Sequence, residues 1–562
     1  MEARMKGFSV IIVAFLFVCG VSCQSTSKNE MADIVFLDGV VWTVNSNQPQ
    51  AKALAIKGNR ILKVGSNSEM ERVTGNSTEV INLQGAFVLP GFIDCHTHFL
   101  DGGFSLSNVQ LREAKSPEDF VARIEEKAQE IADGAWILDG NWDHQQFDPP
   151  ELPRKEWIDS VTPDNPVCVY RHDGHMVLAN SAALKLAGIS KDTPEPEGGE
   201  IIRDPQTGEP TGILKDAAMD LVMGHIPVAT LEEKIAAASM ALKRANRFGV
   251  TSIHDMASLS SYEVYRELLN QNQLTARLYV YIPISAIDIL TGAEKRVFPG
   301  SDLLKIAGLK GFVDGSLGSS TALFFDPYSD DPEKRGLLVS DMFPQGIMEK
   351  RLMAADQAGL QVAVHAIGDQ ANQIILDLFE KVVEKNGERD RRWRVEHAQH
   401  LVPEDFERFG KLRVIASVQP YHAIDDGRWA EKKIGKERAR HTYAFRSFLD
   451  SGAVLACGSD WTVAPINPLT GIHAAVTRQT LDGNNPDGWI PEQKISLEEA
   501  IRGYTLNAAF TEFAEHLKGS LEEGKLADVV ILDQNLFAIP PEKILNTQVV
   551  MTVLDGKIIY RK

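Results

Sequence analysis

Two histidines separated by one residue follow an apolar run, in Asp94-Cys95-His96-Thr97-His98. The apolar run at 86–93 suits a strand that is buried on both faces, as in a parallel sheet. Side chains two residues apart on a strand point the same way, so both imidazoles can reach one metal ion. Chance pairs and core histidines give the same pattern, so the pair alone does not establish a metal site.

The order of strand followed by titratable side chain recurs along the chain. Short apolar segments lead to His254, His365, His397 and Asp460. Three of these segments follow a helical stretch closed by a glycine, which is a common signal of a helix C-terminus. Alternating helices and short apolar strands are typical of parallel βαβ units.

Eight such strands can be counted, and they predict an α/β fold, a (β/α)8 TIM barrel. Catalytic side chains of that fold stand at the carboxyl ends of the strands, where all the side chains named above fall. The strands are predicted near 87–93, 250–254, 276–282, 306–313, 361–365, 393–397, 412–418 and 453–458.

The first predicted barrel strand ends near 93 and the second begins near 250, far more than one βα connection needs. Residues 103–230 are therefore predicted to form a large inserted domain. An insertion after strand one leaves the barrel on its catalytic face, so we expect it to roof the site and to contact substrate. The barrel itself is predicted to take 86–102 and 231–519.

Strand signals gather at both ends of the chain. The segments 34–44 and 553–560 each place Asp-Gly between strand formers, and 53–64 repeats the pattern with Gly-Asn. Such pairs are strong hairpin signals. A small β-sandwich built from both termini, 33–85 and 520–562, is the economical interpretation.

The composition is that of an ordinary globular protein with more than one domain, at 562 residues, 44% hydrophobic and 24% charged. The net charge of -19 argues against a nucleic-acid partner, which would require a basic surface. A small-molecule substrate is the expected partner. A homodimer is compatible with the sequence, but no segment identifies an interface.

The N-terminus has the pattern of a targeting signal. Basic residues precede an apolar core at 8–18 that is too short to span a bilayer comfortably. The small residue before Cys23 then resembles a bacterial lipoprotein processing site. Residues 1–23 are thus a predicted lipoprotein signal with Cys23 lipidated, and 24–32 a tether; plain secretory cleavage near Ser22 is the alternative. Both predict an exported protein, either periplasmic or bound to a membrane only through its lipid anchor.

Beyond this segment only Cys95, Cys168 and Cys457 remain. An odd and sparse set of cysteines does not make a disulfide framework, even in an exported protein.

Taken together, these motifs resemble the amidohydrolase superfamily. The residues that carry the resemblance are the 90–98 segment, His365, His397, Gly458-Ser459-Asp460 and the closing segment 519–528. More narrowly, the chain resembles the branch of N-substituted formamide deformylases and exoenzyme-regulatory amidohydrolases. Asp314-Gly315-Ser316-Leu317-Gly318-Ser319, Arg171 to His175 with Asn180-Ser181, and the 458–468 segment carry that closer likeness.

The resemblance implies a metal centre. His96 and His98 would hold one divalent ion with Asp460, and His365 and His397 a second. Imidazole and carboxylate ligands suit zinc, although iron, manganese or cobalt could substitute. The resemblance also implies that Lys310, in the fourth barrel strand, is carboxylated and bridges two metals. An unmodified Lys310 paired with Asp314 or Asp460 is the alternative, which leaves one metal or two open.

The implied reaction is metal-dependent hydrolysis of a non-peptide C–N bond, of the amide type, in a small substrate. Metal-activated hydroxide attacks the carbonyl group, and Asp460 takes the proton from water and passes it to the leaving nitrogen. Asp255 and Glu396 are candidates to orient the ligating histidines. The rival hypotheses are a non-catalytic binding or regulatory lipoprotein on the same fold, and a hydrolase of esters, lactones or dipeptides.

Four side chains are candidates for substrate binding, each with a structural alternative. Arg171 and His175 come from the insertion, and Arg171 can equally form an internal ion pair with Asp173. His422 ends the seventh strand, and Trp461 either lines the pocket or belongs to the core. Two further positions are less defined: His254 can face the site or be satisfied by neighbours, and Asp216 stands where relatives are expected to carry glutamate.

Overall fold

The computed structural model describes residues 30–292, 298 and 300–562. The predicted signal at 1–23, its lipidation site Cys23 and the tether up to residue 29 lie outside the described residues. Within the described chain, no helix has the length and apolarity needed to cross a membrane. Cys95, Cys168 and Cys457 are buried and free.

Eight parallel strands of the described chain form the central sheet, which confirms the predicted TIM barrel. The sheet runs in the order β21-β20-β19-β18-β17-β16-β15-β8. Backbone hydrogen bonds from Asp460 N–H to His96 O and from His98 N–H to Trp461 O join its two ends. The strands are β8 (Phe92–Thr97), β15 (Val250–Met256), β16 (Arg277–Pro283), β17 (Leu304–Phe312), β18 (Gln361–Ala366), β19 (Arg394–His397), β20 (Ile415–Val418) and β21 (Leu455–Cys457).

The predicted first barrel strand is wrong in its position. The run at 87–93 is divided by Gly91 into β7 (Phe87–Pro90) and the start of β8. Only β8 belongs to the barrel, because β7 pairs with strands of the terminal domain. Gly91 lies so close to Thr251 that a Cβ there would stand 2.3 Å from its Oγ1. The other seven strands fall where the sequence predicts them, with their ends shifted by up to three residues.

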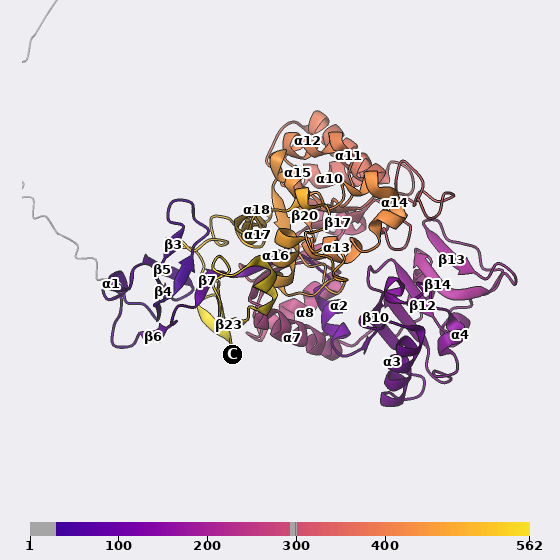
Figure 1. The fold of residues 1–562 in the computed structure, drawn as a ribbon, viewed down its shortest axis with the longest axis horizontal. Helices are drawn as coiled ribbons and strands as arrows, with labels where there is room; N and C mark the ends of the chain where they lie inside the picture. The colour runs from indigo at the N-terminus through magenta and orange to yellow at the C-terminus, as the bar shows by residue number, and fades with distance from the viewer. Residues whose placement is uncertain (1–29, 293–297, 299) are drawn as a thin grey trace, which may run out of the picture.

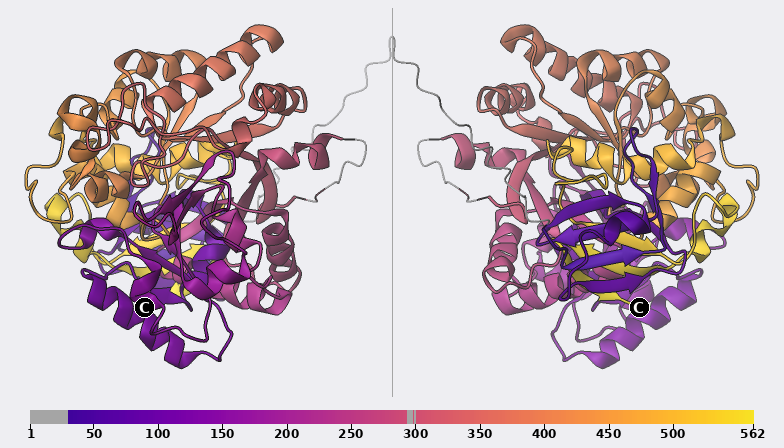
Figure 2. Two further views of the ribbon diagram at one scale, coloured as in Figure 1. Left: turned by 90° about the vertical axis from the view of Figure 1, so that its right-hand side faces the viewer. Right: turned by 90° about the vertical axis from the view of Figure 1, so that its left-hand side faces the viewer.

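Helices cover the outside of the barrel (Figure 2). α7 is typical: Thr230 and Glu233 form a capping box at its start, and a stripe of alanines faces the core. The described helices of the barrel domain are α2 (Phe99–Ser105), α7 (Leu231–Arg247), α8 (Leu259–Asn270), α9 (Ile287–Thr291), α10 (Ile347–Gln357), α11 (Asp369–Asn386), α12 (Pro403–Leu412), α13 (Pro420–Asp426), α14 (Ala430–Ala439), α15 (Phe445–Asp450), α16 (Pro468–Thr477), α17 (Leu497–Gly503) and α18 (Leu506–Thr511).

Strands from both ends of the chain pack together on one side of the barrel, where the right-hand view of Figure 2 shows the first and last strands side by side. Their two sheets enclose one apolar core. One sheet has the order β5 (Arg60–Gly65), β4 (Ala53–Lys57), β1 (Ile34–Leu37), β6 (Glu79–Asn82). The other has the order β24 (Lys557–Arg561), β23 (Val549–Leu554), β22 (Val529–Leu532), β7, β2 (Val40–Trp42), β3 (Gln50–Ala51).

Two of the three predicted hairpins are present, as β4–β5 and β23–β24. The hairpin predicted over 34–44 is wrong, because β1 and β2 belong to different sheets. β4 and β6 already occupy both edges of β1. The chain crosses to the second sheet at Asp38, which has a φ of 55° and accepts hydrogen bonds from the side chains of Asn67 and Asn82.

A fourth sheet forms the inserted region on the opposite side of the barrel (Figure 1). We call it the roof. Separate apolar clusters cover its two faces. Its strand order is β13 (Gly199–Arg203), β14 (Pro210–Asp216), β12 (Met176–Ala179), β11 (Val167–Arg171), β10 (Ile137–Trp142), β9 (Val109–Gln110). Its helices are α3 (Pro117–Glu130), α4 (Lys155–Ile158), α5 (Ser181–Leu186) and α6 (Asp220–Met223).

Candidate active site

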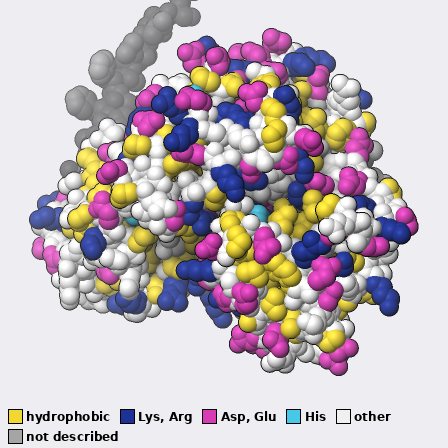
Figure 3. Space-filling view, turned by 45° about the vertical axis from the view of Figure 1, so that its right-hand side comes forward, with side chains coloured by type: hydrophobic (Ala, Val, Ile, Leu, Met, Phe, Trp, Pro, Cys, Tyr) yellow, Lys and Arg dark blue, Asp and Glu magenta, His cyan; other side chains and the backbone are white. Residues whose placement is uncertain are grey.

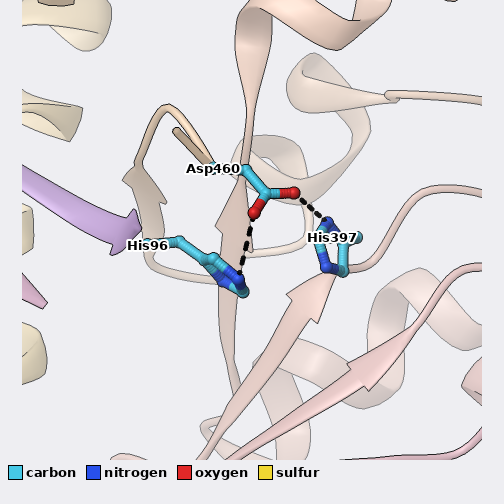
Figure 4. A group of neighbouring side chains, drawn as sticks. All are labelled: His96, His397 and Asp460. Atoms are coloured by element: carbon cyan, nitrogen blue, oxygen red, sulfur yellow. Dashed lines mark ion pairs between the residues drawn. The ribbon is translucent and has the colours of Figure 1, made fainter. Parts of the chain in front are cut away.

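Three potential metal ligands converge at the carboxyl ends of the barrel strands. The ligand atoms of His96, His397 and Asp460 all lie within 4.8 Å of one another. His96 comes from β8, His397 ends β19, and Asp460 follows β21, so distant segments of the chain meet here. In Figure 4 the Asp460 carboxylate lies between the two imidazoles, 3.5 Å from His96 Nε2 and 3.9 Å from His397 Nδ1.

A buried carboxylate fixes the orientation of His96. Its Nδ1 donates to Glu396 Oε2 over 2.5 Å. Burial opposes the charge on Glu396, but Arg394, His96 and Lys310 together outweigh burial and lower the pKa of the carboxyl below its ordinary range. Because an ionised carboxylate can only accept, the His96 proton must be on Nδ1, which leaves the Nε2 lone pair for a metal.

Burial and the Lys310 ammonium lower the pKa of His96 to about 4, so its imidazole is neutral at pH 7. Metal ligands must be in that form. Glu396 is held in turn by Arg394 Nε at 2.7 Å and by the Ser417 hydroxyl at 2.7 Å. Glu396 therefore stands where the sequence analysis proposed an orienting partner.

The other three predicted histidine ligands surround the same centre. His98 Nε2 lies 3.4 Å from Asp460 Oδ1, and the rings of His365 and His397 are 4.5 Å apart between centroids. His365 Nε2 donates to Gly315 O at 3.1 Å, and His397 Nδ1 donates to Gln419 Oε1 at 2.8 Å. The sequence predicted two histidine pairs, one with His96 and one with His397. The close group of His96, His397 and Asp460 thus contains one histidine of each pair.

Lys310 points from β17 into the same centre, with Nζ 3.4 Å from His96 Nε2. Burial lowers the pKa of its amine to about 8. The alternative pairing with Asp314 is not formed: that carboxylate accepts backbone N–H groups of Leu323, Ile367 and Gly368. Nor does Asp460 Oδ1, which faces His96 and His98, make an ion pair with Lys310 among the described residues.

The donor set fits a divalent metal. Neutral imidazoles with a carboxylate are preferred zinc ligands, and the unprotonated Nε2 of His96 faces the centre, where Lys310 Nζ lies 3.4 Å from it. A cavity of about 360 Å³ opens above these side chains, and His98, His365 and Lys310 also line it. Figure 3 shows histidine atoms in a recess near the centre of this face.

The amidohydrolase family profile matches residues 79–560. The chain belongs to the amidohydrolase family. It is 41% identical to protein LONG AFTER FAR-RED 3 of Arabidopsis thaliana, over 98% of this chain and 97% of that one. It is 27% identical to the N-substituted formamide deformylase of Arthrobacter pascens, over 95% and 99%.

A crystal structure of an uncharacterised metal-dependent hydrolase from Pyrococcus horikoshii OT3 superposes with a TM-score of 0.74. The two chains are 28% identical, and the match covers 91% of this chain and 99% of the other. The family match and this structural neighbour support the assignment of the chain as a hydrolase.

The roof of this amidohydrolase supplies the far wall of the cavity. Arg171 lines it, and its guanidinium pairs with Asp173 at 2.6 Å and with Asp143 at 3.1 Å. The internal ion pair that the sequence left open is therefore formed. His175 Nδ1 donates to Asp216 Oδ1 at 2.6 Å, so the aspartate holds a cavity-lining imidazole.

A barrel loop fastens the roof in this position. The hydroxyls of Ser316 and Ser319, from the 314–319 motif, both donate to Asp173. Asp173 also pairs with Arg171, so one carboxylate connects the loop after β17 to the roof. The sequence singled out this motif only for its family likeness, and the structure gives it a positioning role.

Two predicted positions lie elsewhere. Asp255 does not reach the ligating histidines: it accepts from Phe99 N–H at 2.7 Å and from Tyr265 OH at 2.6 Å, at the start of α2. Trp461 packs against Phe99 and the Gly102 backbone, so it belongs to the core, as the structural alternative predicted. Its neighbour Thr462 lines the cavity instead. A strand-end position does not decide on which side of the barrel wall a side chain points.

His254 lies between neighbouring side chains and does not line the cavity. Its Nδ1 lies 2.8 Å from Arg394 Nη1, and its Nε2 lies 3.3 Å from Glu512. Two further partners of the site, Arg394 and Gln419, were not predicted from the sequence. Arg394 could have been found, because it precedes Glu396 by two residues on one strand and so shares its face.

Proposed function

We propose that this amidohydrolase hydrolyses a non-peptide C–N bond, of the amide type, in a small substrate with the help of divalent metal. The observation that carries the proposal is the oriented His96, whose Nε2 faces Asp460 at 3.5 Å on the floor of the cavity. The relative named N-substituted formamide deformylase supports an amide-type substrate.

The residues that would hold metal are His96, His98, His365, His397 and Asp460, with zinc as the proposed ion. A bound divalent ion supplies a nucleophile at neutral pH and polarises a carbonyl group. Asp460 accepts the proton of the attacking water and returns it to the leaving nitrogen. His98 and His96 face one oxygen of Asp460, while His397 faces the other, and these contacts hold the carboxylate in place.

We propose that Lys310 is carboxylated, and that the added carboxylate would then help the histidines and Asp460 to hold two zinc ions. Only a neutral amine attacks carbon dioxide, and the pKa of about 8 gives Lys310 a neutral fraction near physiological pH. Attack of Nζ on the carbon and loss of one proton give a carbamate. The change replaces a buried cation, without a carboxylate partner in the described structure, by an anion suited to two metal cations.

We also propose that the protein is exported and anchored by lipid at Cys23, on the N-terminal sequence pattern alone. A Cys23→Ser variant should move from the membrane fraction to the soluble fraction of the cells that express it. If the variant fractionates as the parent does, the anchor is elsewhere or absent.

The first experiment is metal analysis of protein that begins after Cys23, followed by hydrolysis assays. About two equivalents of zinc or another divalent ion support the bridged centre, and about one equivalent removes the bridging role of Lys310. The assays compare N-substituted formamides with matched esters, lactones and dipeptides. Preferred cleavage of formamides supports the proposal. Preferred cleavage of another class, or metal-loaded protein without turnover, overturns it in favour of the rival hypotheses.

A further inference from the structure

A second group of polar side chains lines the cavity beside the ligands. His422 lies on α13 and Trp429 directly before α14. Both are more than nine-tenths buried, with 8% and 9% exposure. Within the described residues, His422 Nε2 and Trp429 Nε1 are buried atoms without a hydrogen-bond partner.

Leaving such atoms unpaired costs free energy, because each has lost its water without gaining a partner. Two of them on one cavity wall point to a ligand that completes their hydrogen bonds. The His422 ring lies nearly parallel to that of His397, with the centroids 6.4 Å apart. His422 therefore borders the reacting centre, and Trp429 lines the same cavity, so both can meet parts of a substrate bound there.

The chemistry of Trp429 fixes one requirement. An indole N–H only donates, so the ligand must present an acceptor atom. His422 does not restrict the choice further, since a neutral imidazole both donates and accepts.

Charge restricts the acceptor. Six aspartates line the cavity, against one permanent cation, Arg171, and the titratable amine of Lys310. Arg171 is already paired with Asp143 and Asp173. Away from the proposed metal ligands, a carboxylate on the substrate would therefore meet more carboxyl groups than cations on the cavity wall. The lining aspartates are Asp101, Asp139, Asp173, Asp425, Asp426 and Asp460.

We propose that His422 and Trp429 form a specificity subsite for an uncharged oxygen acceptor, such as a carboxamide carbonyl, on the amine portion of the substrate. The inference rests on the proposed function, because it takes the bond broken at Asp460 to be an amide. It makes the preferred substrates amides of neutral polar amines, and it disfavours N-acyl amino acids and dipeptides, whose carboxylate the cavity opposes.

The test measures binding separately from turnover. Three amines that differ in one group serve as product probes for the metal-loaded protein: 4-(aminomethyl)benzamide, 4-methylbenzylamine and 4-(aminomethyl)benzoate. Calorimetry should show the carboxamide bound roughly tenfold more tightly than the methyl compound, since the latter leaves the indole N–H unpaired. The carboxylate should bind most weakly. The three N-formyl derivatives then give kcat and KM.

Trp429→Phe removes the donor and keeps an aromatic ring. The carboxamide and the methyl compound should then be bound about equally, and the lost preference should show mainly in KM. Trp489→Phe is the matched control, because that buried indole donates to Glu431 instead. The control should keep the parental preference. If Trp429→Phe does not fold, His422→Gln is measured in its place and should reduce the same ratio.

Equal binding of the three amines, tightest binding of the carboxylate, or a preference that survives both substitutions would overturn the subsite. Binding preference without hydrolysis of any formamide would refute the proposed function and leave the subsite standing. Hydrolysis without preference would do the reverse.

Discussion

Replacing Glu396 with glutamine tests how His96 is prepared for metal. The substitution keeps the shape of the side chain and removes its charge. Its two carboxylate oxygens now contact Arg394 at 2.7 Å, His96 Nδ1 at 2.5 Å and the Ser417 hydroxyl at 2.7 Å. Glutamine leaves a buried guanidinium without its carboxylate partner and permits either tautomer of His96.

Two separate losses follow from these contacts. Breaking a buried ion pair by removing one partner costs about 3–5 kcal/mol of unfolding free energy. Loss of a carboxylate behind a ligating histidine weakens metal binding by about 10–100-fold. Because the folded-state pKa of Glu396 lies below its ordinary value, the stabilisation is present above about pH 4 and is lost only as the pH falls through the folded-state pKa. Both effects should be complete at pH 7.

The assay is zinc titration of chelator-treated protein against a competing chelator, with urea unfolding measured in parallel. Asp528→Asn is the matched control. Asp528 forms a comparable buried pair with Arg277, at 2.6 and 2.8 Å. It should lose stability but bind zinc as the parent does. Parental zinc affinity in Glu396→Gln would refute the orienting role, and equal losses of affinity in both variants would show that general destabilisation is the cause.

Three further predictions follow from the same structure. Asp460→Asn should fold, as circular dichroism will show, but lose about 10²–10⁴ in kcat/KM on the best amide; full activity with metal bound would remove its role. Carbamate formation at Lys310, followed by ¹³C NMR at equal concentrations of dissolved labelled carbon dioxide, should be about fivefold faster at pH 8 than at pH 7, because the neutral fraction of the amine grows through a pKa of about 8; Lys310→Met should give no signal, and a rate that does not vary with pH would contradict the assignment. Gly103→Ala should cost about 1–3 kcal/mol in urea unfolding, because a Cβ would stand 2.2 Å from Ala237 O; Gly224→Ala, whose nearest atom is 3.4 Å away, is the control, and equal stability of the two variants would disprove the packing argument.

The barrel was predictable because each strand carries its own local signal. Apolar segments preceded by a glycine-closed helix, as before His365, mark a βα unit without knowledge of the rest. The division at Gly91 carries no such signal, since 87–93 is apolar on both sides of it. Only the pairing of β7 with β22, from the far end of the chain, decides to which domain that half of the run belongs.

The site could be predicted from two features of the sequence, the residue types that bind metal and their positions at the ends of strands. His96, His397 and Asp460 meet because parallel strands bring their carboxyl ends together. The partners of these ligands were harder to find. Asp255 and Glu396 both sit in barrel strands, yet only Glu396 contacts a ligating imidazole. That difference depends on which neighbour packs against each strand.

The pairing of β7 with β22 also determines when this sheet can be completed during synthesis of the chain. About 440 residues separate the paired segments 87–90 and 529–532. At roughly 5–20 residues per second, a ribosome takes about 20–90 s to cover that interval. Throughout it, the β7 edge that β22 will cover stays unpaired and exposed to other nascent chains. Completion of this sheet is therefore among the last steps of biogenesis, and a chain that stops short of β22 keeps an open edge.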